Sequence, residues 1–202
     1  MSEARLEDVG PGLAPVTPGW FVVNVNDAAW VANDAFGARC VFESSPRVLA
    51  ERPDAEPQLF EQVGVTLTVI QPGKPSGLYH SESAQEDFLV LAGACVALIE
   101  GEERPLRRWD FVHCPPGTAH CFVGAGEGPC VLLMLGARFE GRTLHYPRSE
   151  LALRHGAGVD EETDSPRDAY APLPHWRPGR PEWAIVDSNH GPPPYQSGAL
   201  TN

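Results

Sequence analysis

The stretch HSESAQE at residues 80–86, followed by Gly93, restricts the fold more than any other part of the sequence. A second stretch, DFVHCPPGTAH, occupies residues 110–120 and ends on a histidine. Together the two stretches contain four side chains that can bind a metal: His80, Glu82, Glu86 and His120. A divalent metal requires several nitrogen or oxygen donors that converge on one point. The two stretches therefore predict a metal site.

The spacing of these residues suits a site inside a small barrel. His80 and Glu82 are two residues apart, so on a strand they point to the same face. Glu86 has the same parity, and His120 arrives from a later strand after the turn-forming segment Pro115–Thr118. Three donors would come from one strand edge and one from a neighbour.

The two stretches resemble the two motifs of the cupin family, G-x5-H-x-H-x3-E-x6-G and G-x5-P-x-G-x2-H-x3-N. Six residues are in register with these motifs: His80, Glu86, Gly93, Pro115, Gly117 and His120. Four positions depart from them: Lys74, Glu82, Trp109 and Gly124. The resemblance covers roughly residues 60–137 and implies a double-stranded β-helix, a bound metal and a homodimer.

Glu82 stands where the family has its second histidine, and three interpretations of it remain open. It is a metal ligand, an unliganded acid that serves as a catalytic general base, or a sign that the metal has been lost. Two histidines and two carboxylates would suit one divalent ion per chain, Zn, Fe, Mn or Ni. Phe88 shares the parity of Glu86 and Phe122 that of His120, so both are predicted to line an apolar pocket for a small organic ligand.

The rest of the chain predicts an all-β protein of the jelly-roll type. Alternation in residues 63–70 and short strands separated by Gly and Pro indicate the barrel over residues 60–137. We expect a flexible arm over residues 1–18, and N-terminal strands with a loop over residues 19–59. Residues 138–202 should form an extension with a proline-rich tail that wraps the barrel or a partner subunit.

Several shorter elements follow from local signals. Phe21–Val25 and Ala38–Glu43 are typical of strands. Short helices are predicted at Ser149–Gly156, with Ser149 as N-cap, and at Ser165–Ala171, with Pro166 at its first position.

Composition excludes several classes of function. The formal net charge is −12, which argues against binding nucleic acid or anionic membranes. The N-terminus is acidic and lacks the apolar segment of a secretory signal, and no apolar run could span a bilayer. The five cysteines contain no Cys-x-x-Cys pair, so a cytoplasmic protein with reduced thiols is expected.

Two functions fit these observations. The first is a metal-dependent enzyme that acts on a small molecule, and the resemblance implies dioxygenase, isomerase or lyase chemistry without choosing among them. The second is a non-catalytic small-molecule-binding or sensor protein that keeps the pocket. Metal content and the redox activity of the metal discriminate between them.

Overall fold

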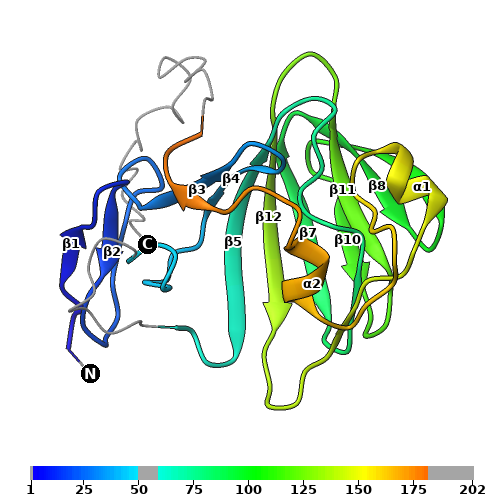
Figure 1. Cartoon of the computed structure of the whole chain (residues 1–202). Helices are drawn as coiled ribbons and strands as arrows, with labels where there is room; N and C mark the ends of the chain where they lie inside the picture. Colours follow the sequence, from blue (N-terminus) through cyan, green and yellow to red (C-terminus); the bar gives the residue numbers. More distant parts are fainter. Residues whose placement is uncertain (1, 50–58, 182–202) are drawn as a thin grey trace, which may run out of the picture.

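The computed structural model describes residues 2–49 and 59–181, and a large antiparallel sheet runs through most of it (Figure 1). Its strands lie in this order: β10 (Phe111–Cys114), β7 (Glu86–Ala92), β12 (Cys130–Ala137), β5 (Val63–Ile70), β4 (Gly37–Cys40), β3 (Trp30–Asn33) and β14 (Arg177–Pro178). A second sheet contains β11 (His120–Ala125), β8 (Ala94–Ile99) and β9 (Glu102–Arg107). The fold is the predicted all-β barrel.

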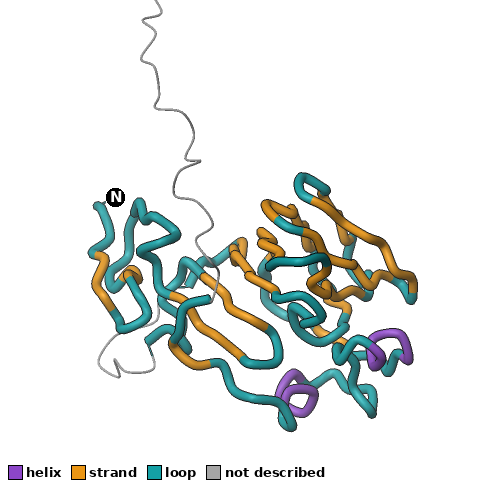
Figure 2. The backbone as a smooth tube through the Cα atoms, turned by 90° about the horizontal axis from the view of Figure 1, so that it is seen from above, coloured by secondary structure: helices purple, strands orange, loops and turns teal. Residues whose placement is uncertain are grey.

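Figure 2 shows the strands from above. The hydrophobic core is formed by side chains from strands of both sheets. Alternate residues of the facing strands point into it. Its buried members are Ile70, Phe88, Val90, Cys95, Ala97, Val112, Cys114, Phe122, Cys130 and Leu132. Gly93 closes the tight connection between β7 and β8 with a φ of 69°, and a Cβ there would lie 2.3 Å from the Pro129 carbonyl oxygen. The motif glycine is therefore needed for close backbone approach.

The N-terminal segment differs from the expectation in two respects. Residues expected to form a flexible arm contain a hairpin, β1 (Leu6–Asp8) and β2 (Leu13–Pro15), because Val9 and Ala14 bury against a small apolar cluster. Phe21–Val25 is not a strand, since Asn24 accepts hydrogen bonds from the amides that follow it and starts a turn. Of the predicted loop at residues 44–59, residues 50–58 lie outside the described part.

The C-terminal extension packs on the barrel. Helix α1 (Glu150–Arg154) is capped by Ser149 and buries Ala152 against β8 and β11. Helix α2 (Pro166–Tyr170) is capped by Ser165, with proline in its first turn, as predicted. Between the barrel and these helices, β13 (Leu144–His145) pairs with β6 (Ser81–Glu82). The proline-rich tail at residues 182–202 lies outside the described residues.

Within residues 2–49 and 59–181, the helices are too short and too polar to cross a membrane.

Candidate metal centre

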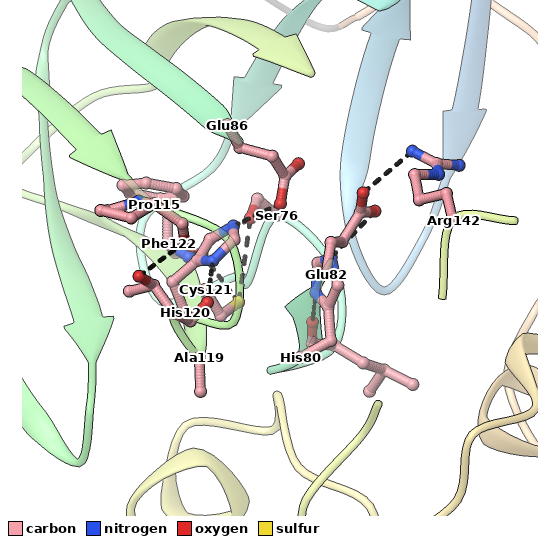
Figure 3. A network of polar contacts seen from close by, with 12 residues as sticks. Ser76, His80, Glu82, Glu86, Pro115, Ala119, His120, Cys121, Phe122 and Arg142 are labelled. Carbon is pink, nitrogen blue, oxygen red and sulfur yellow. Dashed lines mark hydrogen bonds and ion pairs between the residues drawn. The ribbon is translucent and has the colours of Figure 1, made fainter. Parts of the chain in front are cut away.

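Backbone pairing brings the two motif histidines together. His80 precedes β6 and forms an isolated bridge with His120, the first residue of β11. Each donates its backbone N–H to the carbonyl of the other, at 3.2 and 2.8 Å. The two rings consequently lie with their centroids 5.2 Å apart. Glu86 begins β7, and Figure 3 shows its carboxylate facing His120. The two motifs therefore meet at one point.

Both imidazoles are oriented by backbone carbonyls. The Nδ1 atom of His80 lies 2.8 Å from the Leu78 oxygen, and that of His120 lies 3.0 Å from the Thr118 oxygen. A carbonyl oxygen can only accept, so each Nδ1 must carry the hydrogen and donate it. In the neutral ring the Nε2 atom then presents a free lone pair. Metal-binding histidines are commonly fixed in this way.

The third donor is a carboxylate oxygen that has no hydrogen-bond partner. Glu86 Oε2 is buried and unpaired among the described residues, and it lies 3.3 Å from His120 Nε2. Two lone-pair-bearing atoms at this distance repel unless a proton or a cation lies between them. Ligand atoms of His80, Glu86 and His120 all lie within 4.8 Å of one another. These three residues therefore fit a metal ion.

The surroundings of the cluster favour the neutral form of His120 and disfavour the ionised form of Glu86. Burial, reinforced by the negative charge of Glu82, raises the pKa of Glu86 to about 7. Burial and the neighbouring His80 lower the pKa of His120 to about 4. Burial also opposes protonation of His80, but Glu82 and Glu86 outweigh it and raise the pKa of His80. A divalent cation would relieve the unfavourable environment of the Glu86 carboxylate.

Glu82 is held differently from the other three predicted ligands. Its side chain is only 8% exposed, and its Oε2 accepts from Arg142 Nη1 at 2.9 Å. Its Oε1 lies 3.7 Å from His80 Nε2, so Glu82 reaches both Arg142 and His80 (Figure 3). Burial opposes ionisation, yet His80 and Arg142 outweigh it and lower the pKa of Glu82. Glu82 is thus an ionised carboxylate beside the cluster rather than one of the three converging donors.

A cavity of about 990 Å³ opens onto this cluster. Phe88 and Phe122 line it, as predicted from strand parity, with ring centroids 4.5 Å apart. His113 does not line it, because the side chain is half exposed and its Nδ1 lies 2.6 Å from an Asp87 oxygen. His113 therefore lies on the barrel surface.

The sequence interpretation missed the cavity residues outside the two motifs. Those with large polar or aromatic side chains include residues of β4, of the connection after β12 and of the C-terminal extension: Arg39, Arg138, Arg142, Tyr146, Tyr170 and Trp176. Arg39 Nη2 donates to the Ser76 carbonyl, and its guanidinium stacks 4.6 Å from the Trp176 ring centroid. The sequence shows only that basic residues are fewer than acidic ones in this chain. The fold is needed to show that several arginines meet at the cavity.

Comparisons with known proteins bear on the fold of the barrel. Residues 66–136 match the cupin domain family. A sugar phosphate isomerase of the cupin superfamily from Silicibacter pomeroyi is 19% identical, with 81% of this chain and 97% of that chain covered and a TM-score of 0.50. The level of identity means that this likeness shows the fold alone.

Two further structures are similar over shorter stretches. A putative sugar phosphate isomerase from Acidithiobacillus ferrooxidans is 26% identical over 54% of this chain, with a TM-score of 0.41. The chain covers 64% of that protein, which is less than two thirds of its length. A polyketide cyclase from Streptomyces resistomycificus is 15% identical, with 57% of this chain and 78% of that chain covered and a TM-score of 0.45. No curated protein matches the chain.

Proposed function

Since this chain carries a cupin domain at residues 66–136, we propose that it is a metal-dependent enzyme that acts on a small organic molecule in the barrel cavity. His80, Glu86 and His120 would hold one divalent metal per chain. The observation that carries the proposal is the convergence of two imidazole Nε2 atoms on a buried carboxylate oxygen that has no hydrogen-bond partner among the described residues. Buried polar atoms in folded proteins nearly always have a bonding partner, so an unpaired buried oxygen indicates a bound ion or ligand.

The donor set suggests the kind of metal and its use. Two imidazoles and a carboxylate suit Fe(II), Mn(II), Ni(II) or Zn(II), and three protein ligands leave positions open for substrate or water. When bound, such a metal acts as a Lewis acid or activates water or oxygen. The cavity residues would bind the substrate and exclude bulk water. Dioxygenase, isomerase and lyase chemistry are all compatible with this arrangement.

Glu82 is assigned a role beside the metal rather than on it. Its ion pair with Arg142 holds the carboxylate in place, and Oε1 lies 3.7 Å from His80 Nε2. We propose that it serves as the catalytic general base. The lowered pKa of Glu82 makes it a weak base, so it would accept protons only from a substrate or a water molecule that has been made more acidic.

The decisive experiment is metal analysis of protein purified anaerobically. About one divalent ion per chain is expected in the wild type, and His120→Ala should lose it. His113→Ala removes an exposed histidine outside the cavity and is the matched control that should keep the metal. Full metal content in His120→Ala would refute the site. A wild type that binds no metal would favour the non-catalytic binding or sensor protein.

We also propose that the chain forms a homodimer in the cytoplasm. Strand β10 is an edge of the large sheet, and the nearby Trp109 and Phe111 are each 62% exposed. An open edge with exposed aromatic residues is commonly covered by another chain. All five cysteines are buried and unpaired, which suits a reducing compartment.

A further inference from the structure

The cavity gathers basic residues in a chain whose net charge is −12. Of the 15 Lys and Arg residues, five line the cavity: Arg39, Arg47, Arg138, Arg142 and Arg167. Among the described residues, two carboxylates line the same space, Glu82 and Glu86. The cavity therefore has an excess of positive charge, whereas the chain as a whole is negative.

Two of the five arginines are neutralised by carboxylates. Arg138 forms a two-pronged ion pair with Glu43, with both N–O distances at 2.8 Å. Arg142 is paired with Glu82. Arg39, Arg47 and Arg167 have no carboxylate partner within residues 2–49 and 59–181. Within the described part of the chain, the arginine charge at the cavity that lacks an ion pair therefore lies on these three residues.

Arg39 is the most constrained of the three. It lies on β4, where it pairs with Thr68 of β5. Its side chain lines the cavity. Its Nη2 donates to the Ser76 carbonyl, and the Trp176 ring covers one face of the guanidinium. Its Nε is buried and donates to no atom of the described residues. A guanidinium presents five N–H donors, so within the described residues several of the Arg39 donors have no protein acceptor.

Arg39 is only partly buried, but its Nε atom is buried, and a buried donor is unfavourable unless an acceptor pairs with it. A carboxylate or phosphate fits best, because its oxygens accept two N–H groups of a guanidinium side by side. Arg47 and Arg167, at the same cavity, would add attraction at longer range. The metal cluster lines that cavity too, so an anion held at Arg39 would leave the rest of a molecule facing the cluster.

We propose that Arg39 is the anion-binding residue of the cavity and that the substrate is a small organic anion with a carboxylate or phosphate group remote from its reacting end. This inference rests on the proposed function for the metal end, but the anion subsite itself is built without the metal ligands. Arg39 lies outside residues 66–136, so the match to the cupin domain does not assign it.

The test is calorimetric titration with three probes: succinate, inorganic phosphate and the neutral diamide succinamide. Wild type should bind at least one anion at millimolar concentration or below and should not bind succinamide. Arg39→Gln should weaken anion binding by about tenfold to a hundredfold, as expected for a lost charge-assisted hydrogen bond. The preference between succinate and phosphate identifies the anionic group.

Two variants keep the result interpretable. Arg39→Lys keeps the charge and loses the planar fork, so intermediate affinity is expected even if Arg39→Gln unfolds. Arg107→Gln removes an exposed arginine of β9 outside the cavity and should bind as wild type does. Equal anion affinity in wild type and Arg39→Lys, equally tight binding of succinamide, or no anion binding to wild type would each overturn the inference.

Metal content measured in the same samples separates the two proposals. Full metal with anion affinity independent of Arg39 refutes the subsite and leaves the metal site standing. Anion binding that depends on Arg39 in a wild type without metal refutes the proposed enzyme and leaves the subsite standing.

Discussion

Replacing Glu86 with glutamine should stabilise the metal-free protein while preventing metal binding. The pKa of Glu86 rises from 4.5 to about 7 on folding, chiefly through burial. The folded state thus binds this proton more tightly than the unfolded state. The stability it contributes is present below pH 4.5 and is lost as the pH rises through about 7. The difference corresponds to about 3 kcal/mol in the free energy of unfolding.

Glutamine avoids this loss because it does not ionise, and its amide can donate to the free Nε2 of His120, which lies 3.3 Å from Glu86 Oε2. Metal-free Glu86→Gln should therefore exceed wild type by about 3 kcal/mol at pH 8 and by only about 1 kcal/mol at pH 5. Urea unfolding of chelator-treated protein at the two pH values measures this. Excess Zn(II) should then stabilise wild type and not the variant.

The matched control is Glu140→Gln, which makes the same change at an exposed glutamate outside the cavity. It should show neither the pH-dependent gain nor the loss of stabilisation by metal. A stability difference between Glu86→Gln and wild type that is the same at pH 5 and pH 8 would refute the account of a buried, poorly stabilised carboxylate.

Three further outcomes are expected. Glu82→Ala should keep the metal, with affinity lowered by no more than about a hundredfold in a competitive chelator titration; complete loss of metal would make Glu82 a ligand. Gly93→Ala should lower the free energy of unfolding by more than about 2 kcal/mol in a denaturation experiment, because its Cβ would collide with the Pro129 carbonyl. Gly117→Ala is the control: Gly117 has a similar φ but open space around it, so the loss should be only about 1–2 kcal/mol. Light scattering should show a dimer at micromolar concentration that Phe111→Glu converts to monomer; a monomeric wild type would contradict the proposed assembly.

Sequence reasoning reached the barrel and the approach of its two motifs because both depend on local patterns. Strand alternation and Gly or Pro turns set the positions of β5 and β12, and the two short helices carry clear capping residues in Ser149 and Ser165. Parity also placed Phe88 and Phe122 on the cavity side. Such signals act over a few residues and can therefore be recognised in one chain.

Long-range partners escaped this reasoning. Parity placed Glu82 with the other acidic donor, but the ion pair with Arg142, 60 residues away, is set by the pairing of β6 with β13. Arg39 and Trp176 lie at opposite ends of the chain and meet only because β4 and the C-terminal extension both border the cavity. The hairpin near the N-terminus was missed because its few apolar residues gain burial only against a distant cluster.

Arg39 and Trp176, which stack on each other, lie outside the part of the chain that holds the three converging donors. The two parts of the cavity can therefore change separately. His80, Glu86 and His120 belong to the barrel, whereas these two residues come from segments that precede and follow it. A designer could replace the flanking segments to accept a different molecule and leave the three converging donors intact. A chain trimmed to the barrel would keep the three donors but would lose Arg39 and Trp176, and with them the proposed anion site. The proposed metal site and the proposed anion site would then be separate modules of one small protein.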